Sequence, residues 1–141
     1  MSNMQNMAIA EVSIGQELPA ITIPITLQRL VMEAGANRDL SLIHHDGDVA
    51  RSTGAPDAFA NTYFLMGMFE RLMRQWAGPG ARIRKIGPLR MMIFNAVGDT
   101  VSFKGTVESV NTSAGEVSLH MWVESERGKT VTCSALVNLA V

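Results

Sequence analysis

The sequence feature that most constrains the fold is a long apolar segment in the middle of the chain, AFANTYFLMGMFERLMRQWAG, residues 58–78. Up to Phe69 its only polar groups belong to three adjacent residues, Asn61, Thr62 and Tyr63. A segment of this length and composition is predicted to be a helix, and an apolar helix has to be surrounded by other parts of the protein. Only its last turns are amphipathic, because they carry Glu70, Arg71, Arg74 and Gln75.

The predicted bounds of this helix come from the residues that flank it. It is expected to begin after Pro56-Asp57 and to be stopped by Gly78-Pro79-Gly80. A shorter helix is predicted over LQRLVMEAGA, residues 27–36, with Thr26 as its N-cap and Gly35 able to end it. The sequence RDLSLIHHDGD, residues 38–48, is therefore expected to lie on a loop after the shorter helix.

The rest of the chain supplies strands that can cover the long helix. ELPAITIPIT suits a bent or edge strand, because Pro19 and Pro24 interrupt it. Beyond the helix, four segments are predicted to be antiparallel strands, the last two with clear one-face alternation: KIGPLRMMIFN, TVSFKGTVESV, EVSLHMWVES and TVTCSALVNLAV. The expected turns are Gly98-Asp99, NTSAG and Glu126-Arg127-Gly128. A hydrophobic helix wrapped by an antiparallel sheet is an α+β arrangement, the hot-dog fold.

Composition limits the size of the protein and the class of its ligand. At 141 residues the chain is predicted to be a single domain, residues 1–141, with residues 1–12 poorly ordered. The formal net charge of -1 gives no overall field that would favour nucleic acid or a membrane, so a small-molecule or protein ligand is expected. The N-terminal sequence lacks the features of a signal peptide, and the single cysteine, Cys133, excludes an internal disulfide. We expect a cytoplasmic protein.

The sequence of residues 38–48 is the candidate site, because it places acids and bases beside aliphatic residues. Asp39 and His44 have a structural alternative, a carboxylate at a helix end and a histidine satisfied in a loop. Another alternative is a metal site, since zinc or manganese ligands are present: His44, His45, Asp46 and Asp48. Neighbouring side chains diverge, however, and no His-x-x-x-His or Cys-x-x-Cys spacing accompanies them, so no metal is expected.

The run Asp39-Leu40-Ser41-Leu42-Ile43-His44 resembles the Asp-x-Asn-Pro-(Ile/Leu)-His signature of MaoC-like dehydratases, the R-specific enoyl-coenzyme A hydratases, which have the hot-dog fold. The resemblance continues through GAPDAFANTYFLMG and PLRMMIFNAVGDTVSFKGTV, and it covers roughly residues 26 to 140. It departs where Ser41-Leu42 replaces Asn-Pro, and where Arg38 occupies a position that is often glycine.

The resemblance implies a reaction and the two residues that perform it. The family adds water across the α,β double bond of an acyl-coenzyme A thioester, or removes it, with an aspartate and a histidine and no metal. Asp39 and His44 match these two residues. A carboxylate that accepts one hydrogen of water, beside an imidazole that holds the oxygen, can orient and deprotonate the water as attack begins. Coenzyme A would be part of the substrate, and no separate cofactor is implied.

Further substrate contacts are implied at the start of the long helix. There the family uses the N–H of a His-Gly pair to stabilise the enolate oxygen, and Asn61 and Thr62 match that pair. The Cβ of Thr62, which glycine lacks, leaves less room for the enolate oxygen to approach that N–H. Tyr63 is predicted to line the acyl pocket, and Ser41 to orient the loop through a hydrogen bond. Arg90 is a candidate contact for the phosphates of coenzyme A, the alternative being a solvated strand end.

The expected function is that of an R-specific 2-enoyl-CoA hydratase or 3-hydroxyacyl-CoA dehydratase. One alternative is a non-catalytic or partner subunit of a hetero-oligomeric MaoC-like hydratase, which binds acyl-CoA while a second chain supplies the reacting pair. Another is a hot-dog acyl-CoA thioesterase, in which water attacks the carbonyl carbon. Fold alone does not separate the three. Because a single hot dog has an edge strand and a shallow cleft, we expect a homodimer or higher oligomer, or a hetero-oligomer with a second hot-dog chain.

Overall fold

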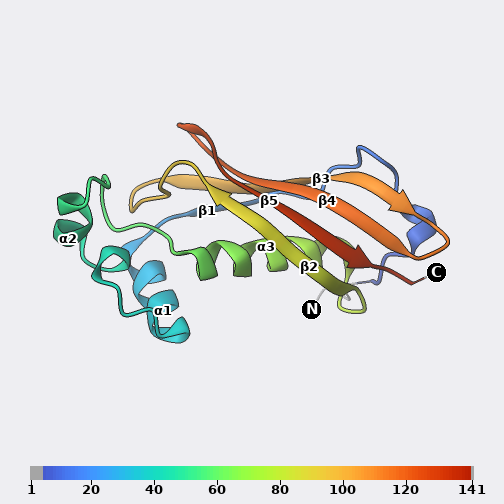
Figure 1. Ribbon diagram of the computed structural model, residues 1–141, viewed down its shortest axis with the longest axis horizontal. Coiled ribbons are helices and arrows are strands. Elements are labelled where there is room, and N and C mark those ends of the chain that lie inside the picture. Colours follow the sequence, from blue (N-terminus) through green and yellow to red (C-terminus); the bar gives the residue numbers. More distant parts are fainter. Residues whose placement is uncertain (1–4, 141) are drawn as a thin grey trace.

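A five-stranded antiparallel sheet forms one layer of the molecule (Figure 1). The computed structural model describes residues 5–140. The strands are β1 (Ile21–Pro24), β2 (Arg82–Met91), β3 (Thr100–Asn111), β4 (Glu116–Ser125) and β5 (Gly128–Asn138). They lie in the order β1-β3-β4-β5-β2, so β1 and β2 are the two edges. The predicted antiparallel sheet is confirmed, and the interrupted segment that contains Pro24 is an edge strand, as expected.

The second layer is the long helix α3 (Thr62–Ala77), which lies along one face of the sheet (Figure 1). It begins later than the predicted start after Asp57. Phe59 instead forms an isolated bridge with Ala96, so the chain before the helix is extended. The side chain of Asn61 is the N-cap, because its Oδ1 accepts a hydrogen bond of 2.8 Å from the N–H of Phe64. The arrangement of helix and sheet is the predicted hot-dog fold.

Two short helices stand at one end of the molecule, α1 (Leu27–Asn37) and α2 (Gly47–Ser52) (Figure 1). The N-cap of α1 is Thr26, as predicted, and its Oγ1 accepts a hydrogen bond from the N–H of Arg29 at 3.2 Å. The helix passes Gly35 and ends at Arg38, which adopts the left-handed conformation with φ 56°. That conformation is costly for a residue with a Cβ.

The segment between α1 and α3 is more regular than the predicted loop. It contains a single 3-10 turn, η2 (Leu42–His44), followed by α2. The carboxylate of Asp46 caps α2 by accepting hydrogen bonds from the N–H groups of Asp48 and Val49. The short side chains and Gly47 gave no apolar period by which a helix of this length could be predicted.

The hydrophobic core lies between α3 and the sheet. Phe69 of α3 and Phe103 of β3 are fully buried and meet edge to face, with ring centroids 5.4 Å apart. The inward residues of β4 are 0% exposed, as their alternation predicts: Val117, Leu119, Met121 and Val123. His120 and Trp122, which lie between them in the sequence, are partly exposed on the other face of the sheet.

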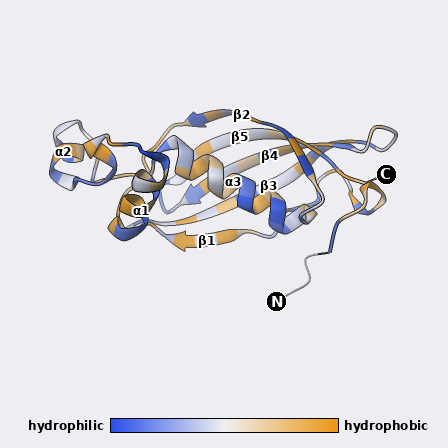
Figure 2. Ribbon diagram, turned by 90° about the horizontal axis from the view of Figure 1, so that it is seen from below, coloured by the Kyte–Doolittle hydropathy of each residue, from blue (hydrophilic) through white to orange (hydrophobic). Residues whose placement is uncertain are grey.

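The face of α3 that points away from the sheet is not covered by any part of the chain that the structure describes. Tyr63 is 61% exposed, and Gly67 is exposed as well. We expected the apolar turns of this helix to be surrounded by other parts of the protein. That expectation is right only for the face of α3 that packs against the sheet. In Figure 2 the half of α3 next to α1 is white to orange, while the other half carries blue segments. None of the helices within residues 5–140 is long and apolar enough to cross a membrane.

The N-terminal segment packs against the opposite end of the sheet from α1 and α2. Its amide groups bond to the rest of the protein, from Met7 N–H to Ala77 O and from Ile9 N–H to Ala140 O, each at 3.0 Å. Ile9 is 5% exposed and Val12 is 9% exposed. The prediction of a poorly ordered segment over residues 1–12 is thus wrong for residues 7–12, because their apolar side chains join the core. Residues 1–4 lie outside the described residues.

Candidate active site

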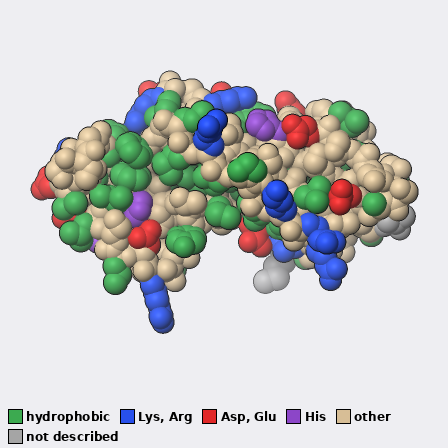
Figure 3. Space-filling view, viewed as in Figure 1, with side chains coloured by type: hydrophobic (Ala, Val, Ile, Leu, Met, Phe, Trp, Pro, Cys, Tyr) green, Lys and Arg blue, Asp and Glu red, His purple; other side chains and the backbone are tan. Residues whose placement is uncertain are grey.

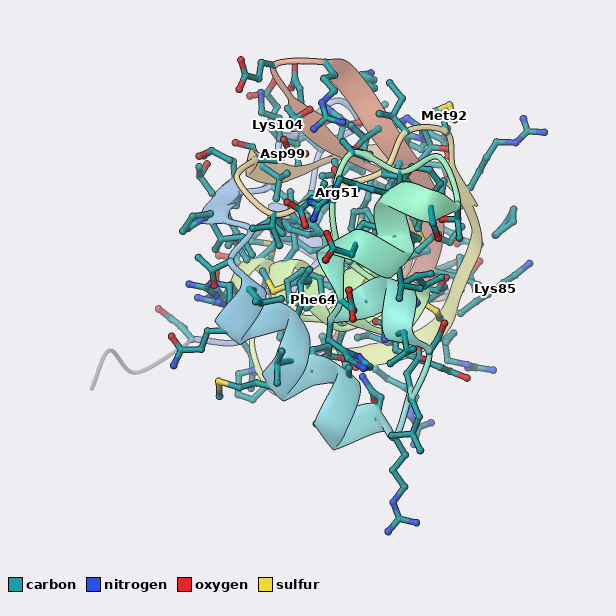
Figure 4. All side chains as sticks on the ribbon, turned by 90° about the vertical axis from the view of Figure 1, so that its left-hand side faces the viewer. Arg51, Phe64, Lys85, Met92, Asp99 and Lys104 are labelled. Carbon is teal, nitrogen blue, oxygen red and sulfur yellow. The ribbon has the colours of Figure 1, made fainter. Side chains whose placement is uncertain are left out.

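Five of the seven predicted site residues meet in a cleft at the end of the molecule that carries α1, α2 and the N-terminus of α3. The cleft has a volume of about 340 Å³ and is lined by Asp39, His44, Phe59, Asn61, Thr62, Tyr63 and Met91. All of these except Phe59 and Met91 were named from the sequence. Figure 4 looks onto this end, with α1 and α2 nearest the viewer and Phe64 of α3 behind them.

Asp39 directly follows the C-cap of α1. Its carboxylate accepts two hydrogen bonds, from Asn61 Nδ2 to Oδ2 at 2.9 Å and from the Ser41 N–H to Oδ1 at 3.3 Å. Donors stabilise the charged form of a carboxyl group. The bond from Asn61 is therefore the main cause that lowers the pKa of Asp39 from its ordinary value, against an opposing effect of desolvation. The carboxylate is ionised at neutral pH.

His44 lies at the end of η2 and is 9% exposed. Its Nδ1 is 2.8 Å from the carbonyl oxygen of Phe59. Because a carbonyl oxygen only accepts, we assign the ring hydrogen of the neutral imidazole to Nδ1, which leaves a lone pair on Nε2. Nε2 lies 3.5 Å from Asp39 Oδ2. Two acceptors therefore face the same space, where a water molecule can donate one hydrogen to each.

A short extended segment, residues 58–60, holds this pair from behind. The carbonyl oxygen of Phe59 holds the His44 ring by a hydrogen bond. Asn61, two residues later, holds the Asp39 carboxylate by another. Three backbone hydrogen bonds pin the segment itself: Phe59 N–H to Ile43 O at 3.3 Å, Ala60 N–H to Asn95 O at 2.9 Å, and Val97 N–H to Ala58 O at 2.9 Å. The side chains of Asp39 and His44 thus share one rigid support.

An ion pair with a buried carboxylate and an exposed arginine fixes the turn on the other side of that segment. Asp99 is 7% exposed, and its two carboxylate oxygens lie 2.6 and 2.8 Å from Arg127 Nη2. Asp99 Oδ2 also accepts a hydrogen bond of 2.9 Å from the N–H of Ala96, the residue that bridges to Phe59. The sequence indicated only two turns here. The signal available for this pair was the opposite charge of two residues in predicted turns at the same end of the sheet, Asp99 before β3 and Arg127 between β4 and β5.

The N-terminus of α3 opens into the cleft. The first N–H groups of a helix have no partner within the helix, and they carry the positive end of its dipole. Asn61 Oδ1 accepts a hydrogen bond from the N–H of Phe64. Among residues 5–140, the N–H groups of Thr62 and Tyr63 have no hydrogen-bond acceptor. They can therefore bind an oxygen that gains negative charge.

The other predicted contacts have different places. Ser41 acts through its N–H, and its hydroxyl makes no hydrogen bond to any residue that the structure describes. Tyr63 stands at the cleft with most of its surface exposed. Arg90 is not in the cleft. Its neighbour Met91 lines the cleft, whereas Arg90 lines a separate hollow with His120, Thr132 and Ser134.

The remaining polar residues near the site stabilise local structure. Arg51 forms ion pairs with Asp48 at 2.6 Å and with Asp57 at 3.2 Å. Asp46 is occupied as the cap of α2. Within residues 5–140, no three His, Cys, Asp or Glu side chains are grouped so as to hold a metal ion.

Exposed apolar residues adjoin the cleft, and the sequence patterns did not single them out. Leu40 and Leu42 flank Ser41, Met92 follows Met91, and the ring of Phe94 packs 4.3 Å from that of Phe59. Their exposed fractions are 80% for Leu40, 52% for Leu42, 51% for Met92 and 38% for Phe94. Figure 3 shows hydrophobic side chains gathered over this end of the molecule. Such a cluster on a protein surface is typical of a ligand or subunit interface.

Comparison with known proteins gives one clear relative by sequence. No protein-family model matches the chain. The chain is 38% identical over 98 residues to the 3-oxo-4,17-pregnadiene-20-carboxyl-CoA hydratase beta subunit of Mycobacterium tuberculosis (strain ATCC 25618 / H37Rv). The aligned region covers 70% of this chain and 75% of that protein.

Solved structures share the fold. A chain of the ChsH1-ChsH2 complex from Mycobacterium tuberculosis superposes with a TM-score of 0.85 and 32% identity, over 90% of this chain and 98% of that one. The (R)-hydratase from A. caviae involved in PHA biosynthesis superposes with a TM-score of 0.84 and 21% identity, over 92% and 98%. A structure described as a MaoC-like dehydratase gives a TM-score of 0.87 at 22% identity, over 98% of this chain and 44% of that chain.

Proposed function

Because this chain belongs to the family of MaoC-like dehydratases and R-specific hydratases, we propose that it is a hydro-lyase. It adds water to the double bond of a 2-enoyl thioester, or removes water from the 3-hydroxyacyl thioester. The observation that carries the proposal is the geometry of one cleft. Asp39, His44 and Thr62 all line it, His44 Nε2 lies 3.5 Å from Asp39 Oδ2, and the N–H of Thr62 has no acceptor among residues 5–140. The name of the relative, a CoA hydratase subunit, supports an acyl-coenzyme A substrate.

In the hydration direction the pair of acceptors orients the attacking water. Water bound between Asp39 Oδ2 and His44 Nε2 donates a hydrogen to each and turns a lone pair toward Cβ. As the O–Cβ bond forms, the pair takes one proton from the water, and the π electrons move to the thioester as an enolate. The pair then returns one proton to Cα. The site has the same protonation state after each turnover, and dehydration runs through the same steps in reverse.

The start of α3 binds the thioester oxygen in this proposal. Negative charge develops on that oxygen as the enolate forms, and a preorganised N–H at a helix N-terminus stabilises it. Thr62 and Tyr63 supply free N–H groups at that place. Tyr63 also offers an exposed ring beside the acyl chain. The mechanism requires no metal and no cofactor besides the coenzyme A of the substrate.

A second candidate role is that of one subunit in a hetero-oligomeric hydratase. The relative is named a beta subunit, and the solved relative at 32% identity is part of a two-protein complex. The exposed apolar residues next to the cleft and the uncovered face of α3 fit contact with a second hot-dog chain. In this form the second chain closes the cleft, and the chain described here contributes Asp39 and His44.

The test is a hydration assay on the protein alone and on any complex that it forms with a co-purifying hot-dog chain. Both are incubated with trans-2-enoyl-CoA thioesters from short chain to steroid-like, with and without a chelator. Loss of enoyl absorbance, product chirality and free thiol are followed. An R product from wild type but not from Asp39→Asn, unaffected by the chelator, is expected. Free thiol would instead support the thioesterase alternative, and inactivity of both preparations across the panel would contradict the proposal. The cytoplasmic location stays a prediction.

A further inference from the structure

Asn61 touches both halves of the site described above, the carboxylate and the helix start. We propose that Asn61 is a positioning residue that sets the placement of the Asp39 carboxylate relative to the free N–H groups at the start of α3. This inference rests on the hydratase function proposed above. The family resemblance does not supply it, because the family has a histidine at this position.

The geometry of Asn61 uses each polar atom of its side chain once. Oδ1 accepts from the N–H of Phe64 at 2.8 Å, and Nδ2 donates to Asp39 Oδ2 at 2.9 Å. The reverse orientation of the amide would set Oδ1 against a carboxylate and Nδ2 against an N–H, so chemistry fixes this assignment. Asn61 is 4% exposed, so its own amide group is shielded from competing water.

The rigidity of the amide group is what makes Asn61 a link between the two halves. A side-chain amide is planar, so its oxygen and nitrogen cannot move independently. The helix start therefore determines where the Asp39 carboxylate lies. In the proposed reaction the thioester oxygen and Cβ are separated by fixed bonds, and the N–H and the base must match that spacing. A displacement of about 1 Å in such a site lowers the rate roughly 10²-fold.

The alternative is that Asn61 serves only as a helix cap. Serine and aspartate cap helices about as well as asparagine, but serine offers only a short hydroxyl in place of the amide donor. Asn61→Ser keeps the cap and deletes the donor. Asn61→Asp keeps the cap and puts a second carboxylate against Asp39. These two variants separate the capping role from the contact with Asp39.

The electrostatic surroundings of Asp39 make that contact measurable. The groups that act on it are Asn61 from α3, the Ser41 N–H, and the imidazoles of His44 and His45. The Asn61 donor favours the charged carboxylate, so its loss raises the pKa of Asp39. A facing carboxylate in Asn61→Asp raises it further, because two like charges disfavour joint ionisation.

The experiment measures the Asp39 carboxyl titration by carbon NMR in wild type, Asn61→Ser and Asn61→Asp, together with thermal unfolding. The pH dependence of kcat and KM for a trans-2-enoyl-CoA substrate is measured on the same proteins. We expect the Asp39 pKa to rise in the order wild type, Asn61→Ser, Asn61→Asp, with unfolding temperatures close to one another. In Asn61→Ser we expect kcat to fall roughly 10²-fold, KM to change little, and the acidic limb of the profile to move to higher pH.

Equal Asp39 titration and equal kcat in wild type and Asn61→Ser would overturn the inference. If Asn61→Ser does not fold, Asn61→Asp decides the question, since an unchanged Asp39 titration there also contradicts it. The three proteins can show the expected order of Asp39 pKa values while the wild type hydrates no enoyl thioester. That result would leave the link between Asn61 and Asp39 in place. In that case the hydratase function is what fails.

Discussion

The core between α3 and the sheet and the cleft at the start of α3 are held together in different ways. In the core, fully buried apolar side chains such as Phe69 and Phe103 share many nondirectional contacts. In the cleft, the side chains of Asp39 and His44 each depend on one or two directional bonds, from Asn61 to Asp39 and from His44 to the Phe59 carbonyl. The core is therefore sensitive to volume, whereas the cleft is sensitive to the loss of a single donor or acceptor at constant volume.

This difference means that stability and activity can be changed separately, although one helix serves both regions. The buried face of α3 contributes to the core along its whole length, while only its first residues, Thr62 and Tyr63, belong to the cleft. A substitution that preserves shape should leave folding intact and stop the chemistry. One that removes volume should do the reverse. The expectations below test that separation, from the largest effect to the smallest.

The largest effect is expected for Asp39→Asn, which preserves shape and removes the charge. The general base is lost, so kcat should fall on the order of 10² to 10⁴-fold. The unfolding temperature should stay close to that of wild type, because Asp39 is partly exposed and no volume is lost. Enoyl absorbance and a thermal melt give the two numbers. Unchanged turnover would remove Asp39 from the mechanism.

Phe69→Ala should have the opposite signature. Phe69 is 0% exposed, and truncation leaves a cavity against Phe103, so the free energy of unfolding should fall by about 3 to 5 kcal/mol. The kcat of the molecules that remain folded should be near the wild-type value. Denaturant unfolding measures the first quantity, and Phe69→Leu is the matched control with a smaller loss. A large drop in kcat with little loss of stability would show that core and cleft are not separable.

Arg127→Ala tests the boundary between the two regions. It leaves the carboxylate of Asp99, which is 7% exposed, without its cation, and should cost about 1 to 3 kcal/mol of stability. Asp99 also holds Ala96, which bridges to Phe59, so a several-fold loss of kcat is expected as well. Lys104→Ala, which breaks the exposed pair with Glu124, is the control and should cost under about 1 kcal/mol. Equal effects of the two variants would refute a special role for the pair with the buried Asp99 carboxylate.

The smallest effect is expected for Arg38→Gly. Arg38 ends α1 with φ 56°, a conformation that costs a residue with a Cβ about 1 to 2 kcal/mol. Glycine adopts it freely, so the variant should be more stable by about 1 kcal/mol, and Arg38→Ala should not be. Chemical denaturation of the three proteins measures the difference. A destabilised Arg38→Gly would mean that the arginine side chain makes a favourable contact.

Much of the fold follows from local patterns because burial imposes a period on the residues. Val117 to Val123 alternate because one face of β4 meets α3 and the other does not. The end of α3 near Gly78 also follows from local chemistry. Its beginning does not, since Asp57 and Asn61 are both good capping residues. The bridge between Phe59 and Ala96, far apart in the sequence, decides between them.

In the candidate site, too, some residues could be predicted from local sequence and others could not. Asp39 and His44 were named because their spacing lies within one short motif. The donor role of Asn61 and the pairing of Arg127 with Asp99 depend on distances between separate elements, for which the sequence carries no local signal. Arg90 was named as a contact for the phosphates of coenzyme A, and that contact stays a prediction. The strand of Arg90 was placed correctly, but the side chain points into another hollow, because neighbouring residues on a strand face opposite ways.

The pairing of Ala8 with Ala140 has a practical consequence for handling the protein. The bridge between these two residues lies at the end of the molecule remote from α1 and α2 (Figure 1). A fluorescent reporter, an affinity handle or a surface tether joined next to either residue would emerge on that side and leave the cleft mouth unobstructed. The same proximity allows a short peptide to connect the two positions, so that the chain can be reopened at the turn between β3 and β4 as a circular permutant.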